Sequence, residues 1–232
     1  MNYQNISDFS ISELKKIALK LNVDVGGNTK LKMIEIILDQ KDYNYERIKK
    51  LGDKGKDAIA YLIIDRITDD DFVIKQFRKN KKKSLILEEA NIQNEMSKFG
   101  ISPYIVDVDL ERRYIVMQRM TSHLIDLTNK SISISLQKQL LKLLQKMDEK
   151  LIFHNDPNPL NFMIKRGKLF VIDFGMSVRI DEKLIKKIGT SKPNVELGLL
   201  AIILKLKSIE FPISSYSYLK TKIKNEFLNL IS

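Results

Sequence analysis

Apolar residues recur at helical spacing near the start of the chain, first around Leu14–Leu21 and again around Leu31–Leu38. Spacings of three and four residues place such positions on one face of a helix. Gly26-Gly27 interrupts the pattern, and Ser10 or Ser12 precedes the first apolar set as a possible helix cap. The pattern predicts two short helices that flank an extended piece and form a small module over residues 1–42.

Three short apolar runs follow between residues 45 and 77, separated by a glycine-containing turn and by the charged stretch "RITDDD". Such runs predict a small antiparallel sheet. Alternation along the third run places Lys75 on one face with two apolar residues. A lysine in that position requires an anionic partner, because burying an unpaired charge is costly.

The turn between the first two runs contains Gly52 and Gly55. Glycine allows a backbone N–H group to approach a phosphate closely. An ordinary hairpin turn explains the same residues equally well. These glycines alone are therefore compatible with both a phosphate-binding loop and a plain turn.

Residues 84–99 have a helical pattern that places Glu89 on the apolar side of the helix, with Glu88 and Glu95 as alternatives. Two further strands are expected at Ile105–Val108 and Tyr114–Met117.

The clearest helix of the chain is predicted in "SLQKQLLKLLQKMDEKL", which begins at Ser135. Its apolar stripe is interpreted as core and consists of Leu136, Leu140, Leu143 or Leu144, Met147 and Leu151. Strands in the first half and helices in the second predict an α+β fold.

The chain has 232 residues and no cysteine, so structural disulfides and thiolate-zinc sites are excluded. The first residues lack the apolar core of a signal peptide, and no apolar run reaches membrane-spanning length. These features predict a soluble, intracellular, cytoplasmic protein with no membrane association.

The net charge is +11, which can indicate nucleic acid, an anionic membrane or phosphate-bearing ligands. Abundant Lys, Ile and Asn together are also what A/T-rich coding sequence produces. The densest basic cluster is "RKNKKK" at residues 78–83, which is interpreted as a solvated loop or helix start, with phosphate contact as the alternative.

The stretch "FHNDPNPLNFMIKRGKLFVIDFG" predicts a tight hairpin that turns at Arg166-Gly167. This register sets Asn161 opposite Ile172, next to Asp173, so an amide oxygen and a carboxylate meet where they can bind hard cations. Asp156 lies just upstream among prolines, which hold it near that pair. A carboxylate there suits the acceptance of a hydroxyl proton.

The segment "HNDPNPLN" matches the HxDxxxxN loop, and "IDFG" matches the DFG motif, of the protein-kinase-like superfamily. The chain resembles the small atypical kinases of the RIO family and of the KEOPS tRNA-modification complex, over about residues 45–205. The resemblance implies a two-lobed fold, with lobes at 43–118 and 119–232. It also implies an Mg·ATP-dependent phosphotransferase, and in the first place an atypical serine/threonine protein kinase.

The same resemblance assigns roles to individual residues. Asp156 would be the catalytic base, Asn161 and Asp173 would hold Mg²⁺, and Lys75 would bind the ATP phosphates and pair with Glu89. The remaining nucleotide-binding residues would be Gly52, Gly55, Met117, Gln118 and Met120.

Departures from the family pattern keep other functions open. Ala58 replaces a third glycine, Asn158 replaces a lysine, and no APE motif follows Asp173. A small-molecule kinase of the aminoglycoside or choline type shares the metal motif, and a KEOPS-like ATPase is a further alternative. For a kinase, the phosphoryl group would be accepted by a hydroxyl group of a protein or of a small molecule. A degenerate scaffold that only binds a partner is the non-enzymatic alternative.

The module at residues 1–42 resembles the helix–extended–helix modules of the SAP and transcription-terminator type, which often bind nucleic acid. Its six lysines are balanced by six acidic residues. A neutral module is poorly suited to phosphate binding. Nucleic acid is therefore weakly supported, and a protein partner is at least as well supported.

Overall fold

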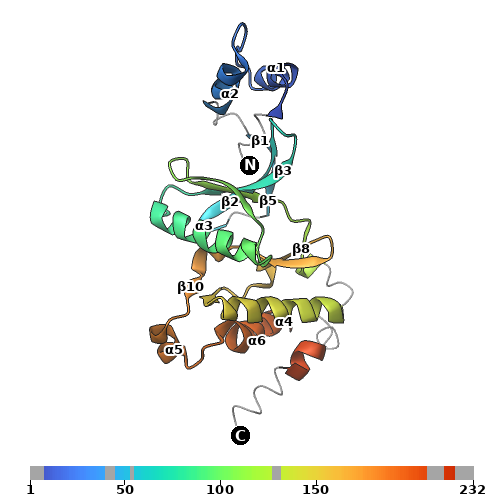
Figure 1. The fold of residues 1–232 in the computed structure, drawn as a ribbon. Helices are drawn as coiled ribbons and strands as arrows, with labels where there is room; N and C mark the ends of the chain where they lie inside the picture. The colour runs from blue at the N-terminus through green and yellow to red at the C-terminus, as the bar shows by residue number, and fades with distance from the viewer. Residues whose placement is uncertain (1–7, 40–44, 53–54, 127–131, 208–216, 223–232) are drawn as a thin grey trace. The chain divides into compact units, whose positions relative to one another are not determined.

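The computed structural model describes residues 8–39, 45–52, 55–126, 132–207 and 217–222 (Figure 1). They form two compact units, each with its own core. Unit 1 contains the described residues up to 86 together with 105–119, and unit 2 contains 87–104 and the described residues from 120 onward. The expected α+β class is confirmed, with a sheet in unit 1 and a mainly helical unit 2.

Unit 1 begins with the two expected helices, α1 (Ile11–Lys20) and α2 (Lys30–Asp39). Ser10 caps α1, because its hydroxyl accepts from the Glu13 amide at 3.3 Å while the Glu13 carboxylate accepts from the Ser10 amide at 2.7 Å. The apolar faces of the two helices form a small core that contains Leu14, Ile17, Ala18, Leu21, Val25, Met33 and Ile37.

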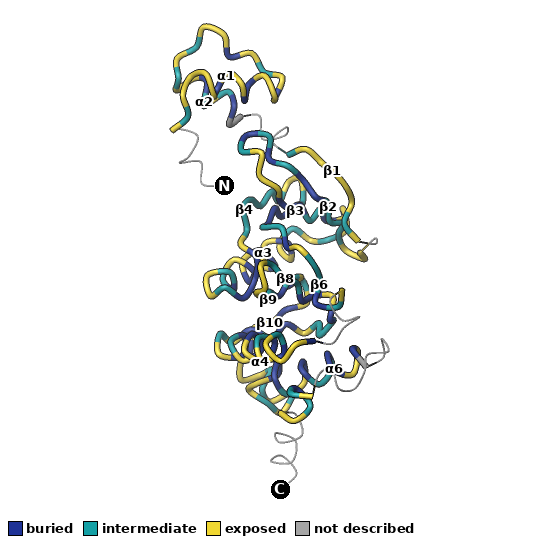
Figure 2. The backbone as a smooth tube through the Cα atoms, turned by 90° about the vertical axis from the view of Figure 1, so that its right-hand side faces the viewer, coloured by how far each residue is buried: buried dark blue, intermediate teal, exposed yellow. Residues whose placement is uncertain are grey.

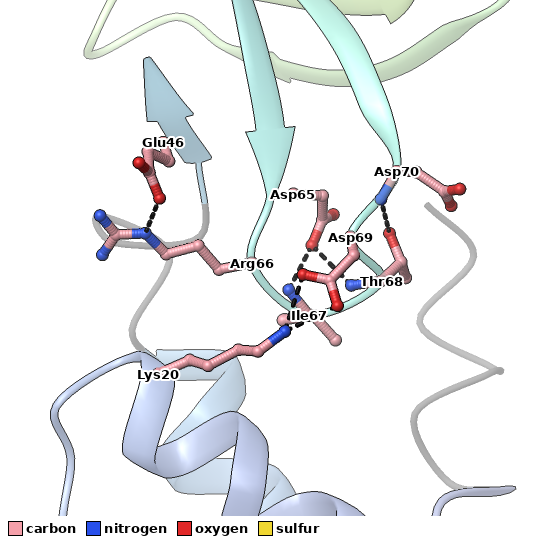
Figure 3. Close-up of polar contacts among 8 residues, drawn as sticks. All are labelled: Lys20, Glu46, Asp65, Arg66, Ile67, Thr68, Asp69 and Asp70. Atoms are coloured by element: carbon pink, nitrogen blue, oxygen red, sulfur yellow. Dashed lines mark hydrogen bonds and ion pairs between the residues drawn. The ribbon is translucent and has the colours of Figure 1, made fainter. Parts of the chain in front are cut away.

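A residue of the sheet completes this small core. Ile67, in the turn between β2 and β3, is buried in the same cluster as the apolar faces of α1 and α2. The Lys20 ammonium lies 2.7 Å from both carboxylate oxygens of Asp69 in that turn (Figure 3). Asp65 shapes the turn by accepting from the amides of Ile67 and Thr68. The charged stretch that the sequence presented as a simple connection therefore carries the contact between the helices and the sheet.

The predicted sheet is confirmed as five antiparallel strands in the order β1-β2-β3-β5-β4. Their bounds are β1 Tyr45–Leu51, β2 Ala58–Asp65, β3 Asp71–Phe77, β4 Ile105–Asp109 and β5 Tyr114–Gln118. β1 is an edge strand and is largely exposed (Figure 2). One face carries the core cluster of Ile63, Phe72, Ile74, Tyr114 and Val116. By alternation, Lys75 points to the other face.

Helix α3 (Lys83–Lys98) leads from unit 1 into unit 2. The other regular elements of unit 2 are β6 Ser122–His123, α4 Ile134–Glu149, β7 Ile152–Phe153, β8 Phe162–Lys165, β9 Lys168–Val171, β10 Val178–Arg179, α5 Glu182–Ile188 and α6 Leu199–Lys207. The strands form two small sheets, β6-β8-β9 and β10-β7. Leu140, Leu144 and Met147 of α4 lie in the core of unit 2, as the sequence predicts.

The assignment of Leu151 to the stripe of α4 is wrong. Helix α4 ends at Glu149, and Leu151 has a left-handed backbone with φ of 56° and is 55% exposed. The next residue, Ile152, belongs to β7 and is fully buried. The apolar spacing continued past the point where the hydrogen-bonded helix stopped.

The predicted boundary between residues 42 and 43 lies outside the described residues, and the domain limits remain a prediction. Among the helices that the structure describes, none is long and apolar enough to cross a bilayer.

Replacing Ile67 tests the contact between the helices and the sheet. We expect Ile67→Ala to lower the free energy of unfolding by about 2–4 kcal/mol, because it leaves a cavity where three elements meet. The measurement is a urea titration of the full chain. Ile48→Ala on the exposed strand β1 is the control and should cost below about 1 kcal/mol. Equal losses in the two variants would contradict the packing role of Ile67.

Candidate functional site

The hairpin of β8 and β9 has the register that the sequence predicts. Lys165 pairs with Lys168 across the turn, where Arg166 and Gly167 have φ of 51° and 75°. Positive φ at both central residues is the geometry of a tight hairpin turn. At the open end the Ile172 amide donates to the Asn161 carbonyl at 2.9 Å. Asn161 therefore lies opposite Ile172, with Asp173 as the next residue.

Asn161 is bonded directly to Asp156. The Asn161 side-chain amide donates to the Asp156 carboxylate at 2.9 Å and to the Asp156 carbonyl at 3.2 Å. Asn161 can reach back to Asp156 because Pro159–Asn161 form a tight 3-10 turn. The Asn158 side chain caps this turn by accepting from the Leu160 amide. Asn161 is buried, so the bond is partly shielded from water. The Asp156 carboxylate is therefore oriented by the residue that the sequence assigns to the metal.

His154 joins the Asp156 loop to the end of the hairpin. Its ring nitrogens lie 3.0 Å from two backbone carbonyl oxygens, those of Asp156 and Ile172. The ring is buried and packs edge-on to Phe174, with centroids 5.2 Å apart. Burial lowers the pKa of His154, while the Ile172 carbonyl and the charge of Asp173 oppose that shift. The histidine thus has a structural place between two chain segments.

Asp173 and Glu89 both lie close to Gly175. Asp173 is exposed and adopts a left-handed backbone with φ of 63°. Built onto Gly175, a β-carbon would lie 2.9 Å from Oε2 of Glu89 and 3.4 Å from Oδ1 of Asp173. The two carboxylates therefore approach the same glycine from different elements, and a side chain at this position would require the buried Glu89 carboxylate to shift.

Burial separates Glu89 from the two alternatives on the same helix. Glu89 is only 2% exposed, whereas Glu88 is exposed. Glu95 is half-buried and accepts from both terminal nitrogens of Arg179, which follows the Asp173 turn in the chain. That pairing lowers the pKa of Glu95 and raises the pKa of Arg179.

Two residues that support the site were missed by the sequence analysis. The Asn194 side chain accepts from the His154 amide at 3.0 Å and donates to Asp148 at 2.7 Å and to the Ile152 carbonyl at 2.6 Å. Asp148 also accepts from the backbone amides of Asn194 and Val195. Burial raises the pKa of Asp148 to about 6, although these hydrogen bonds act in the opposite direction.

A sequence signal existed for only one of these two residues. Asp148 follows Leu144 by four positions, so it lies on the apolar side of α4, where an acid needs partners. Asn194 follows a proline in a loop-like stretch, and nothing in its surroundings marks it.

The candidate residues of unit 1 lie on its sheet and between strands β1 and β2. Lys75 pairs with Ala60 on β2, is half-buried, and has its ammonium 5.3 Å from the centroid of the Phe77 ring. Gly52 has φ of 64°, a conformation that favours glycine. A β-carbon on Gly55 would lie 2.6 Å from the Ala58 carbonyl oxygen, so the tight turn requires glycine there.

The predicted adenine segment lies where the chain passes from one unit to the other. Met117 and Gln118 end β5 in unit 1, and Met120 is the first residue of unit 2 in this part of the chain. Lys75, Gly52 and Gly55 also belong to unit 1, whereas Glu89, Asp156, Asn161 and Asp173 belong to unit 2. The roles assigned to all of these residues remain predictions.

The donor chemistry of unit 2 fits a hard cation. The carboxylate of Asp173 and the amide oxygen of Asn161 are the oxygen ligands that Mg²⁺ prefers. Mg²⁺ is commonly bound by one or two protein groups together with phosphate oxygens and water. Asp173 is an exposed residue.

Comparison with known families gives a match to the protein kinase domain over residues 45–192. This range includes the sheet of unit 1, Lys75 and the Asp156–Asp173 segment. It begins after the helical module, so the resemblance of residues 1–42 to SAP-like modules remains a prediction.

Several curated proteins are similar to the chain. A probable bifunctional tRNA threonylcarbamoyladenosine biosynthesis protein of Methanosphaera stadtmanae is 31% identical over 155 residues, which are 60% of this chain and 28% of that protein. The probable serine/threonine-protein kinase YbdM of Bacillus subtilis is 26% identical over 174 residues, 68% of this chain and 65% of the relative.

The KEOPS complex subunit Bud32 of Pyrococcus abyssi is 26% identical over 101 residues, which are 41% of this chain and 46% of that subunit. The expected resemblance to small atypical kinases is confirmed by these relatives. The chain spans between about a quarter and two thirds of the length of the relatives named here.

Gly175→Ala tests the close approach of Glu89 to the Asp173 turn. We expect a loss of about 1–3 kcal/mol in the free energy of unfolding, because the added methyl meets a buried carboxylate. Gly198→Ala is a matched control, since its nearest neighbour would lie 3.7 Å from the added carbon. Both variants are compared by chemical denaturation. A Gly175→Ala protein as stable as the control would disprove the close packing.

Asp148→Asn tests, through the pH dependence of stability, the hydrogen bonds by which Asp148 and Asn194 hold His154. The raised pKa means that the folded protein binds the Asp148 proton more tightly than the unfolded chain does. Its stabilising contribution is therefore complete below about pH 4 and is lost as the pH rises through about 6. The stability difference between wild type and Asp148→Asn should change by roughly 3 kcal/mol over that range. A difference that stays constant from pH 4 to 7 would rule this out.

Proposed function

Because the chain belongs to the protein kinase domain family, we propose that it transfers the γ-phosphoryl group of Mg·ATP to a hydroxyl group, with Asp156 as the catalytic base. The observation that carries this proposal is the bond between Asp156 and Asn161 at the open end of the β8–β9 hairpin. The bond orients the Asp156 carboxylate beside Asn161, whose amide oxygen suits a metal ion. Asn161 lies opposite Ile172, and Asp173 is the next residue in the chain. A hairpin without a chemical role has no need of that arrangement.

In the proposed reaction Asp156 accepts the proton of the acceptor hydroxyl while the hydroxyl oxygen attacks the γ-phosphorus. The new oxygen–phosphorus bond forms as the bond to the β-phosphate oxygen breaks, and ADP leaves. The Asn161 side-chain amide holds the Asp156 carboxylate by donating a hydrogen bond to it. General-base assistance of this kind contributes about a hundredfold or more to the rate.

Asn161 and Asp173 would hold the magnesium ion, which neutralises charge on the phosphate oxygens when it is bound. Lys75 is proposed to bind the α- and β-phosphates and to pair with Glu89. Gly52 and Gly55 are proposed to cover the phosphates, because their turn can present backbone N–H groups. Met117, Gln118 and Met120 are proposed to contact adenine.

The acceptor is proposed to be a serine or threonine side chain of a protein. Support comes from the relative named as a probable serine/threonine-protein kinase, which matches 68% of this chain. A small-molecule hydroxyl is the competing acceptor. Phosphotransfer to a protein pool but not to aminoglycosides or choline discriminates the two.

A second candidate, an ATPase acting within a protein complex, is favoured by the similarity to the KEOPS subunit. It predicts phosphate release from ATP without any phosphorylated acceptor. The helical module at residues 1–42 is the proposed site for a protein partner, because it is neutral and contacts the sheet through Ile67.

Asp173→Ala and Asp156→Asn separate nucleotide binding from chemistry. At a hundredfold excess over its dissociation constant, Mg·ATP should stabilise the wild-type protein by about 2.7 kcal/mol. Asp173→Ala should lose most of that gain, because it removes a metal ligand. Asp156→Asn should keep the gain and lose phosphotransfer by about a hundredfold or more. Thermal unfolding with and without Mg·ATP and a radiolabel transfer assay give the two readouts.

Glu149→Gln, an exposed carboxylate on α4, is the control and should leave both readouts unchanged. Equal nucleotide stabilisation of wild type and Asp173→Ala would overturn the metal assignment. Near wild-type turnover in Asp156→Asn would overturn the role of the base. A wild-type protein that Mg·ATP does not stabilise would overturn the proposed function as a whole.

A further inference from the structure

Residues 78–83, here called the basic segment, run from the end of β3 to the first residue of α3 in unit 1. The sequence predicts a solvated loop or helix start here, with phosphate contact as the alternative. In the structure their charged side chains differ in what they contact. Arg78, Lys81 and Lys83 contact neighbouring parts of unit 1, whereas Lys79 and Lys82 are exposed.

Three contacts tie the basic segment to the glycine turn. The Arg78 amide donates to the Asp57 carbonyl at 2.9 Å, and the Arg78 guanidinium donates to the Gly55 carbonyl at 3.2 Å. The Lys81 ammonium lies 2.9 Å from the Asp57 carboxylate, and the Lys81 side chain is only 11% exposed. The pKa of Asp57 is lowered, chiefly by the hydrogen bond from Lys81.

The basic segment is itself held from its other side by the β4–β5 turn. The Arg113 guanidinium donates to the Lys81 carbonyl, and the Phe77 amide donates to the Arg113 carbonyl at 2.8 Å. Lys83, the first residue of α3, lies 2.5 Å from the Glu111 carboxylate. The segment is thus fixed between two turns of the sheet, and α3, which carries Glu89, begins directly from it.

The part of the glycine turn that these contacts reach is also sterically tight. A side chain on Gly55 would collide with the Ala58 carbonyl oxygen at 2.6 Å. The backbone from Gly55 to Asp57 is therefore restricted from within by this close approach and from outside by Arg78 and Lys81.

We propose that Arg78 and Lys81 are positioning residues that fix the Gly55–Asp57 arm of the glycine turn in the place needed to cover the nucleotide phosphates. The inference rests on the proposed function, because it assigns the turn to ATP. It gives the basic segment a role through geometry, acting on the turn that contacts the nucleotide. Long-range attraction of an anion is a different role, which any cation of the segment would share.

Lys81→Met and Lys79→Met test that difference, because both remove one charge from the same segment. Lys81→Met should raise KM for ATP about tenfold with kcat changed by less than about twofold, since it breaks a charge-assisted hydrogen bond that holds the turn. Lys79→Met should change KM by less than about twofold. Lys81→Arg, which keeps the charge and the donors, should restore most of the affinity. Equal effects of the two methionine variants would overturn positioning.

Asp57→Asn provides a second route to the same contact. Because Lys81 and Asp57 act as a pair, the Lys81→Met/Asp57→Asn double variant should have nearly the KM of the worse single variant. Effects that multiply in the double variant would show that the pair is not coupled and would overturn the inference.

Hydrogen exchange without nucleotide tests the inference separately from ATP. The amides of residues 55–58 should exchange severalfold faster in Lys81→Met than in the wild type or Lys79→Met. Unchanged exchange in Lys81→Met would overturn the positioning role, whatever the protein does with ATP. Faster exchange together with a wild-type protein that Mg·ATP fails to stabilise would support the contact and overturn the proposed function.

Discussion

The candidate site depends on one buried imidazole that lies between two backbone carbonyls. His154 connects the carbonyl of Asp156 to that of Ile172, so the loop that presents the base and the hairpin that presents Asn161 and Asp173 have a fixed separation. A buried polar ring is tolerated only when its nitrogens have partners. The lowered pKa of His154 favours the neutral ring, which donates to one of these carbonyls, and the ring as a whole lies between the Asp156 loop and the end of the hairpin.

That arrangement requires further buried polar groups beneath it. The His154 amide needs an acceptor, which Asn194 supplies, and the Asn194 side chain in turn is held by Asp148 and the Ile152 carbonyl. Each group is costly to bury alone, and together they form a connected network. Asp148 is placed in this network by α4, whose leucine stripe forms the core of unit 2. In unit 2, helix α4 therefore contributes both to the apolar core and to the hydrogen bonds that position His154.

Unit 1 secures its turns by contacts between segments that are distant in the chain. Ile67 fills the core of the helical module, and Lys20 pairs with Asp69 in the same turn. At another turn, Arg78 and Lys81 hold the backbone around Gly55 and Asp57. Charges that would contribute little as isolated exposed pairs act here together with tight backbone or buried apolar groups. Turns held in this way can present backbone groups to a ligand with little reorganisation.

The sequence by itself determined the α+β class, the β8–β9 register and the closeness of Asn161 to Asp173, because strand alternation and a two-residue turn fix these locally. It placed Glu89 on the apolar side of α3 with Glu88 and Glu95 as alternatives, and burial in the structure separated the three. Tertiary structure decided what local patterns cannot encode. Leu151 is not part of the helical stripe, because α4 ends before it. Asn194 hydrogen-bonds to His154, which is 40 residues away in the chain. The basic segment likewise acquired its contacts only where strand pairing brought distant turns together. Such contacts depend on chain folding over long separations, which leaves no periodic trace in the sequence.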